Sequence, residues 1–129
     1  MQEKAIGFEL TVLPGAELMF ADRYQIEQVL INLVKNAIES FREESREKKI
    51  RIAATTHNSM FRMEVTDSGR GIPQDKLDQI FLPFYTTKEN GSGIGLALSK
   101  QILYHHRGTI SMESTPEEGS CVILEIPKG

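Results

Sequence analysis

The chain has 129 residues, of which 40% are apolar and 26% are charged, so it has the composition of a single folded domain and too little length for two. Its formal net charge of −3 argues against a nucleic-acid-binding protein, and its 3 histidines and 1 cysteine show no metal-ligand spacing. No apolar run approaches the roughly 20 residues that span a bilayer, and the charged residues among positions 1–20 argue against a signal peptide.

The first half of the chain predicts strands around one long helix. Apolar residues alternate with polar ones where we expect strands, and they recur at helical spacing from Ile26 to position 41. In chain order, the expected elements are strands over 7–13 and 18–20, a helix from an N-cap at Asp22 to the charged run 42–49, and strands over 50–57 and 60–67 joined by a tight turn at Asn58–Ser59.

The second half predicts two loops, a second helix and a closing hairpin. The expected elements are a glycine-rich loop over 67–73, a short helical stretch over 74–81, a loop over 83–93, a helix from Ile94 to about His106 that Gly108 ends, and strands over 109–115 and 120–126. Cys121 lies in the apolar pattern of the last strand, which is typical of a small core residue in a reducing compartment. The order of elements indicates an α+β fold, a two-layer sandwich whose mixed sheet is covered on one face by helices.

The stretch ENGSGIGLALS, residues 89–99, has glycines at alternate positions directly before an apolar run. It fits neither the dinucleotide-binding pattern, which needs G-x-G-x-x-G after a strand, nor the Walker pattern, which needs Gly-Lys-Ser/Thr. Glycines nevertheless let backbone N–H groups approach an anion closely, and the helix that follows presents its positive end there. The glycines alone leave two interpretations open: a phosphate cradle, or a flexible loop before a helix.

Two asparagines lie one turn apart on the first long helix. Asn32 and Asn36 fall one above the other on one flank of its apolar face. Asn is a poor helix former, and its side-chain oxygen suits Mg²⁺, which also binds phosphate oxygens. A pair of surface amides is the alternative, and on this helix alone it is the better supported one.

Asp67 continues the inward face of the predicted strand 60–67. A carboxylate directed at a core needs hydrogen-bond donors, and the sequence offers no obvious cation on a neighbouring strand. A ligand amine, such as the exocyclic N6 of adenine, would serve. The alternative is the commoner use of Asp before Gly, as the start of a turn at Ser68–Gly69.

In this order, the features closely resemble the histidine-kinase branch of the superfamily that includes gyrase, chaperone and mismatch-repair ATPases. The resemblance covers roughly residues 8–127 and implies a single ATP-binding catalytic domain over 1–129 with the Bergerat-type fold, a mainly antiparallel sheet, and ATP, ADP and Mg²⁺ as ligands. The matching motifs are QVLINLVKNAIES for the N box, DSGRGI for the first glycine box, IFLPFYTTK for the F box, GSGIGLALSK for the second glycine box and GTISMESTPEEGSCVILEIP for the closing hairpin.

The resemblance also implies roles for individual residues. Asn36 would coordinate Mg²⁺, Asn32 would lie near the phosphates as a catalytic residue, and Asp67 would accept a hydrogen bond from adenine N6. A short, mobile ATP lid would occupy about 84–92. The other implied ATP-binding positions are Gly69 and Gly71 beneath the base, Ile72 against its ring, Ser120 reaching adenine through water, Tyr85, Thr86, Thr87 and Lys88 in the lid segment, and Gly91, Ser92, Gly93, Ile94, Gly95 and Leu96 at the phosphates.

Two positions depart from the family pattern. Glu39 stands where many relatives carry a cation that faces the phosphates, so Lys88 is our candidate for the catalytic cation and Arg70 a weaker one. A solvated loop lysine is the alternative for Lys88. The ATPase branches place a water-activating Glu where this chain has Asn32, and an amide cannot act as a base. This difference favours transfer of the γ-phosphoryl group to another nucleophile over hydrolysis.

None of the three histidines lies in the family's acceptor motif. The resemblance therefore implies a separate dimerisation and phosphoacceptor domain, a response regulator downstream, a monomeric isolated domain and a homodimeric full-length protein. We expect a cytoplasmic kinase core that contacts neither nucleic acid nor membrane. The alternatives are an ATPase or serine kinase of the same superfamily, and a non-catalytic nucleotide-binding module, which Glu39 keeps open.

Overall fold

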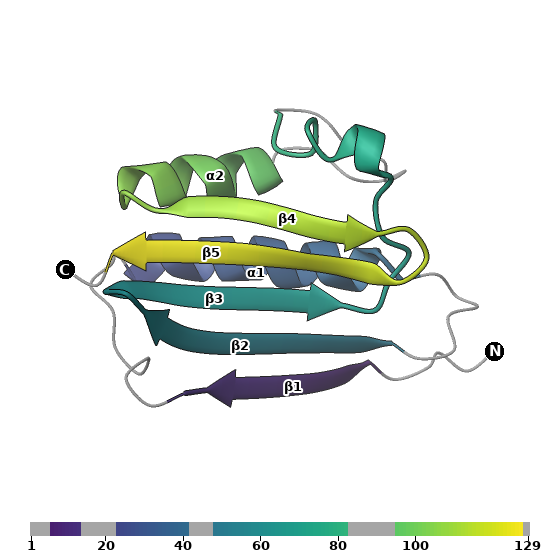
Figure 1. Ribbon diagram of the computed structural model, residues 1–129, viewed down its shortest axis with the longest axis horizontal. Helices are drawn as coiled ribbons and strands as arrows, with labels where there is room; N and C mark the ends of the chain where they lie inside the picture. The colour runs from purple at the N-terminus through teal and green to yellow at the C-terminus, as the bar shows by residue number, and fades with distance from the viewer. Residues whose placement is uncertain (1–5, 14–22, 42–47, 83–94, 128–129) are drawn as a thin grey trace.

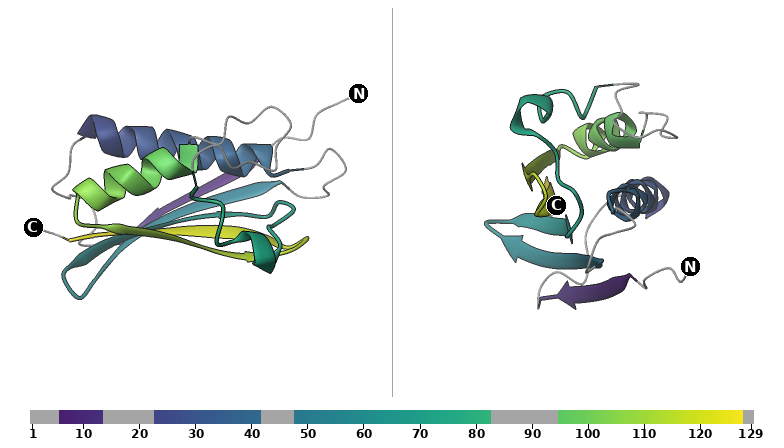
Figure 2. Two further views of the ribbon diagram at one scale, coloured as in Figure 1. Left: turned by 90° about the horizontal axis from the view of Figure 1, so that it is seen from above. Right: turned by 90° about the vertical axis from the view of Figure 1, so that its right-hand side faces the viewer.

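The computed structural model describes residues 6–13, 23–41, 48–82 and 95–127, which form two layers. Both α-helices lie on one face of a five-stranded sheet (Figures 1 and 2), which confirms the predicted α+β sandwich. The elements are β1 (Gly7–Val12), α1 (Arg23–Glu39), β2 (Lys49–His57), β3 (Met60–Asp67), the 3₁₀ turn η1 (Gln74–Lys76), α2 (Gly95–His105), β4 (Thr109–Thr115) and β5 (Gly119–Pro127).

The strands lie side by side in the order β1-β2-β3-β5-β4. β1 and β2 are parallel because the chain crosses back through α1 between them, whereas all other neighbours are antiparallel. The sheet is therefore mixed and mainly antiparallel, as predicted. The last hairpin inserts its second strand, β5, next to β3, and this register puts Ser120 opposite Asp67.

α1 is held over the sheet by one apolar face. Ile26, Val29, Leu33 and Ala37 recur at intervals of three and four residues, and all four are buried. Burying one large aliphatic side chain in this way contributes roughly 1.5–3 kcal/mol. The buried residues that pack with this face are Ile50, Val65, Val122, Leu124 and Ile126 of the sheet and Ile102 and Leu103 of α2.

The predicted turn between β2 and β3 is confirmed. Asn58 and Ser59 both have positive φ, at 50° and 64°. Two consecutive left-handed residues make the type I′ turn, whose twist matches that of the flanking strands. The turn fixes the register that pairs Ile50 with Asp67 at the other end of the hairpin.

α2 ends in a Schellman motif. Its left-handed residue comes one position before Gly108, the residue expected to end the helix. The N–H of Arg107 donates to the carbonyl of Tyr104 (3.0 Å), and the N–H of Gly108 donates to that of Leu103 (2.7 Å). The left-handed residue is Arg107, with φ of 60°. Gly108 is needed for close approach, because a Cβ there would lie 2.4 Å from the carbonyl oxygen of Glu125.

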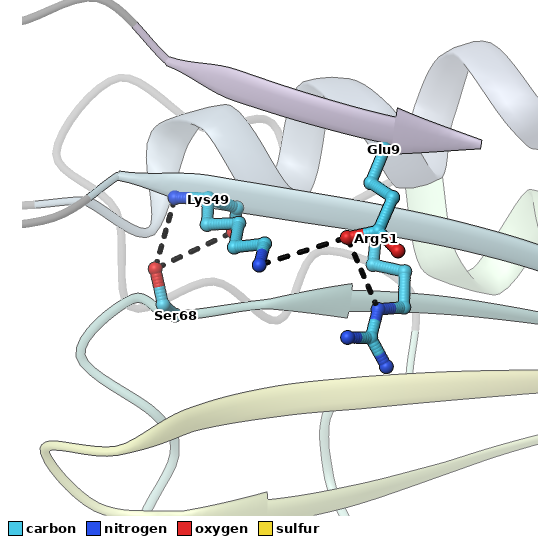
Figure 3. Close-up of polar contacts among 4 residues, drawn as sticks. All are labelled: Glu9, Lys49, Arg51 and Ser68. Atoms are coloured by element: carbon cyan, nitrogen blue, oxygen red, sulfur yellow. Dashed lines mark hydrogen bonds and ion pairs between the residues drawn. The ribbon is translucent and has the colours of Figure 1, made fainter.

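Polar contacts attach the edge strand β1 to β2, and β2 to the loop after β3 (Figure 3). The Glu9 carboxylate lies 3.6 Å from Lys49 Nζ and 3.7 Å from Arg51 Nε. These side chains are about half exposed, so the ion pairs contribute at most about 1 kcal/mol. The N–H of Lys49 donates to Ser68 Oγ (2.9 Å), and Ser68 Oγ donates to the carbonyl of Lys49 (3.4 Å). The N–H of Ser68 donates to the same carbonyl (3.1 Å). The first residue after β3 is thereby fixed to the start of β2.

Two sequence predictions are corrected by the fold. Of the helical stretch expected over 74–81, only Gln74–Lys76 forms a helical element, a 3₁₀ turn without a buried residue, although Ile80 farther along is buried. Cys121 is not a core residue. It is half-buried on the sheet face away from the helices, where its Sγ accepts a hydrogen bond from Thr66 Oγ1 (3.3 Å).

Three sequence predictions lie outside the described residues: the strand over 18–20, the N-cap at Asp22 and the loop over 83–93. Among the helices that the structure does describe, none is both long enough and apolar enough to cross a membrane.

Candidate functional site

Most of the predicted site residues that the structure describes lie toward one end of the sheet. The C-terminal ends of α1 and β3, the N-terminal end of α2 and the turn between β4 and β5 all point to this end (Figure 1). Across the sheet there, the register places Asp67, Ser120 and Ser114 in one row on three neighbouring strands. Segments that are distant in sequence thus meet at the ends of the elements that carry them.

Asp67 is buried at the end of β3, with 8% of its surface exposed. Its Oδ1 accepts hydrogen bonds from the N–H of Gly69 (2.9 Å) and from Ser40 Oγ (3.1 Å). The inward direction expected for this carboxylate is confirmed. The N–H of Gly69 supplies one donor, whereas the single proton of Ser40 is shared with the Ala37 carbonyl, which lies 2.6 Å from Ser40 Oγ. The bond to the N–H two residues on is an Asx turn, so the turn interpretation also holds.

The glycine loop is held between the end of α1 and the β4–β5 turn. The N–H of Arg70 donates to the carbonyl of Ser40 (3.1 Å), and the carbonyl of Arg70 accepts from the N–H of Glu117 (2.7 Å). Gly71 has φ of 71°, and a Cβ there would lie 2.2 Å from the carbonyl oxygen of Thr115. This position therefore requires glycine for both its conformation and its space.

Ile72 and Ser120 are joined through a residue that the sequence analysis did not select. The N–H of Ile72 donates to Ser114 Oγ (2.7 Å), and Ser114 Oγ lies 2.7 Å from Ser120 Oγ. Both serines are buried, with 8% of their surface exposed. The signal was present in the alternation of Ile110, Met112 and Ser114, which puts a hydroxyl on the core face of β4.

Asn32 lies where α1 meets α2. Its Oδ1 accepts from Gln28 Nε2 (3.0 Å), and its Nδ2 donates to Ser99 Oγ (3.5 Å). Ser99 is fully buried one turn into α2. Asn32 and Asn36 are both half-buried. The asparagine flank of α1 therefore faces α2, and the surface-amide interpretation does not describe Asn32.

The two helices run antiparallel, so the N-terminal end of α2 and the C-terminal end of α1 lie at the same end of the helix layer (Figures 1 and 2). Gly95 precedes Ser99 by one turn of α2, and Asn36 follows Asn32 by one turn of α1. The N-terminal end of α2, where the helix dipole favours an anion, thus lies on the Asn36 side of the Asn32–Ser99 contact.

The rest of the predicted phosphate and lid positions lie mainly outside the described part of the chain. Leu96, in the first turn of α2, is half-buried and packs against the core. Phe81 of the F box lies under Lys100, whose Nζ is 5.9 Å from the ring centroid, so this aromatic residue contacts α2. The predicted site residues outside the described ranges are Tyr85, Thr86, Thr87, Lys88, Gly91, Ser92, Gly93 and Ile94.

The donor set at this end fits Mg²⁺ only if a ligand shares the coordination. Within the described ranges, no three His, Cys, Asp or Glu side chains come together to hold a metal ion. Asn36 offers one amide oxygen, and Mg²⁺ is commonly held by one or two protein oxygens together with phosphate oxygens and waters. A metal bound at Asn36 would therefore depend on a phosphate ligand.

The site thus has a buried acceptor at a strand end, beside a glycine loop and two amide-bearing turns of helix. Fold and site together define a nucleotide-binding domain of the two-layer α/β type. Residues 21–129 match the family profile "Histidine kinase-, DNA gyrase B-, and HSP90-like ATPase". The chain belongs to this family.

The relatives are sensor histidine kinases. The chain is 34% identical over 126 residues to sensor protein FixL of Bradyrhizobium diazoefficiens, 39% over 107 residues to sporulation kinase A of Bacillus subtilis, and 40% over 107 residues to sensor histidine kinase ZraS of Escherichia coli. These alignments cover 98%, 83% and 83% of the chain, but only 25%, 17% and 22% of the relatives. The chain thus spans a quarter or less of their length.

Solved structures of histidine kinases match this chain over a single domain. The catalytic domain of histidine kinase ThkA superposes with a TM-score of 0.83 at 40% identity, over 95% of this chain and 79% of that one. Full-length ShkA in complex with AMPPNP superposes with a TM-score of 0.81 at 26% identity, over 95% of this chain and 25% of that one. The predicted resemblance is confirmed: the chain corresponds to the ATP-using catalytic domain of the histidine kinases.

Proposed function

We propose that this domain binds ATP together with Mg²⁺ and donates the γ-phosphoryl group to a histidine on a separate dimerisation domain. The observation that carries the proposal is the buried Asp67 carboxylate at the end of β3, with the glycine loop folded around it. ShkA, a full-length relative in structure, was solved with the ATP analogue AMPPNP, which supports ATP as the nucleotide.

Asp67 would recognise the base. A carboxylate accepts only, so it suits the exocyclic amine of adenine. Gly71 lets the loop pack closely against the backbone of Thr115, because it carries no Cβ, and the loop would then pass beneath the base. Ile72 would lie against the ring, and Ser120 would reach the base through water.

The phosphates would run from this end along α1 toward the N-terminus of α2. Asn36 would hold Mg²⁺, which when bound neutralises charge on the phosphate oxygens. Gly91, Ser92, Gly93, Ile94, Gly95 and Leu96 would offer backbone donors, and Lys88 would supply the cation of the lid segment over 84–92.

Transfer is favoured over hydrolysis by the surroundings of Asn32. Its amide is neutral, cannot take a proton from water, and is held by Gln28 and Ser99. The domain would therefore position ATP and screen its charge while the acceptor histidine attacks in line. A homodimer of the full-length protein, with a response regulator as the next acceptor, follows as part of the proposal.

The decisive experiment is phosphorylation in trans. The 129-residue chain is incubated with γ-labelled ATP, Mg²⁺ and the dimeric histidine domain of the parent protein, and we expect an acid-labile label on that histidine. An acceptor domain with His→Gln serves as the control. Rapid hydrolysis without labelling would support an ATPase instead, and tight ATP binding without either reaction would support a binding module.

The metal site has its own test. Asn36→Ala is expected to remove the tightening of ATP binding by Mg²⁺, measured by calorimetry with and without the metal. Asn58→Ala, in the turn at the far end of the hairpin, is the matched control. If Mg²⁺ still tightens ATP equally in the Asn36 variant, the metal is held elsewhere.

A further inference from the structure

The Ser114 hydroxyl makes three polar contacts, and the family resemblance assigns no role to this residue. Its Oγ contacts the N–H of Ile72 at 2.7 Å, Ser120 Oγ at 2.7 Å and the carbonyl oxygen of Gly119 at 3.1 Å. Ser114 therefore joins the glycine loop to the first two residues of β5. Because it is buried, these protein groups, rather than bulk water, orient its proton.

The three contacts can all be hydrogen bonds in only one arrangement of protons. A serine hydroxyl has one proton and two lone pairs. The N–H of Ile72 occupies one lone pair of Ser114, and the Gly119 carbonyl, which can only accept, takes the proton. Ser120 must then donate its own proton to the second lone pair of Ser114. The reverse arrangement, with Ser114 donating to Ser120, gives up the bond to Gly119.

This arrangement fixes what Ser120 can offer to a ligand. With its proton committed to Ser114, Ser120 Oγ presents lone pairs alone. In the β3–β5 ladder it stands opposite Asp67, whose Oδ1 acts as an acceptor as well. Two neighbouring acceptors favour a ligand edge that carries N–H groups. They disfavour a carbonyl oxygen, which would leave buried lone pairs facing one another.

We propose that Ser114 is a positioning residue that sets the hydrogen-bond polarity of Ser120, and through it the preference for a 6-amino over a 6-oxo purine. The proposal rests on the proposed function, and it requires the base to lie against Asp67 and to contact Ser120 Oγ directly rather than through the water that the resemblance implies. One side chain thus orients both the hydroxyl and the loop amide of Ile72 at the base-binding end.

The test compares ATP with inosine triphosphate, whose base has an oxo group at position 6. In Ser114→Ala, Ser120 loses its acceptor and is free to turn its proton toward the ligand. We expect the ratio of the two affinities, measured by calorimetry, to fall about three- to tenfold, the range of one hydrogen bond. Ser114→Thr keeps the hydroxyl and is expected to retain the ratio. Ser111→Ala, at an exposed position on the other face of β4, is expected to leave it unchanged.

A double-variant cycle separates this role from simple support of the fold. In a Ser120→Ala background, Ser114→Ala is expected to cause no further change in the ratio, because Ser114 acts through Ser120. A further change in that background would overturn the proposal. So would a uniform loss of both nucleotides at constant ratio in Ser114→Ala, since that is the result of loosened packing alone.

Two further outcomes keep the proposal separate from the proposed function. If the native chain prefers ATP and Ser114→Ala keeps the full preference, this proposal fails and the proposed function stands. If the native chain binds neither nucleotide in the presence of Mg²⁺, both fail. Should Ser114→Ala not fold, Ser114→Cys keeps the volume with a weak donor and acceptor, and it is expected to lower the ratio in the same way.

Discussion

Asp67 combines two uses of an aspartate that the sequence presented as alternatives. Its Oδ1 shapes the glycine loop by accepting from the N–H of Gly69, while its side chain remains buried on the helix-facing side of the sheet. Ser40, the first residue after α1, donates to the same oxygen. One carboxylate therefore both fixes the loop and gives the site its negative charge.

Asp67→Asn separates these two uses. The variant keeps an oxygen for the turn but loses the charge, so the fold is expected to survive. Affinity for ATP is expected to fall at least tenfold, because a hydrogen bond to a charged group is worth roughly 1.5–3 kcal/mol. Calorimetric titration measures this, with the exposed Glu113→Gln as the control. Undiminished affinity would remove Asp67 from the site.

Gly71 gives a prediction about stability. Gly71→Ala is expected to lower the free energy of unfolding by about 1–3 kcal/mol, because the residue has a positive φ and its Cβ would meet the backbone of Thr115. In Gly7→Ala the new Cβ would lie 3.8 Å from the carbonyl oxygen of Lys48, an ordinary contact. Urea unfolding compares the two variants, and equal losses would contradict the expectation.

Among single residues, the sequence identifies Asp67 more readily than its partners. Alternation along one strand is local, so the inward direction of Asp67 could be predicted. The same kind of alternation also predicts the inward direction of Ser114. Its role could not be predicted, because its hydrogen-bond partners Ile72 and Ser120 come from other segments of the chain. Ser40 and Ser99 have no local signal, since their contacts depend on how α1 packs.

At the scale of elements, periodicity predicted the helices and hairpins because it records which face of a segment is buried. The boundaries of β2, β3, β4 and α2 fall within one residue of expectation. The insertion of β5 between β3 and β4 could not be read in the same way, because pairing between distant strands leaves no mark on local spacing. η1 shows the opposite case: its segment has a helical composition, but the helical element spans only three residues and buries none of them.

The end of α2 carries the prediction at this scale. Arg107 adopts a left-handed conformation that glycine favours, so Arg107→Gly is expected to raise the free energy of unfolding by roughly 0.5–1 kcal/mol. Arg107→Ala removes the same side chain without this conformational benefit and is expected to give no gain. Thermal unfolding distinguishes them; a gain shared by both variants would attribute the effect to the arginine side chain.

At the scale of the whole molecule, a thiol on the sheet face away from the helices is expected to make the free energy of unfolding depend on pH. Burial raises the pKa of the Cys121 thiol above its ordinary value, and the hydrogen bond from Thr66 opposes this only in part. The folded state therefore keeps the thiol protonated to higher pH than the unfolded state does. The resulting contribution is fully present below the ordinary thiol pKa of roughly 8.5 and is lost as pH rises through the folded value.

This dependence is tested by urea unfolding of the native chain and of Cys121→Ala at pH 7.5 and pH 10. The stability advantage of the native chain over the variant is expected to shrink at the higher pH, because only the native chain can lose the thiol proton. Comparison with the variant cancels the titration of other groups. An advantage that stays constant would show that the thiol titrates equally in both states.

The turn at Asn58–Ser59 lies at the opposite end of the hairpin from Asp67, since β2 and β3 pair from Ile50–Asp67 to His57–Met60 (Figure 1). Length changes there leave the register of the nucleotide end untouched, provided that the new loop still closes the hairpin. The fold thus separates an end whose register must be kept from one that is open to insertion. A lineage can acquire an extra docking loop at this turn, and an experimenter can place a fluorophore there, while the row from Asp67 to Ser114 keeps its geometry.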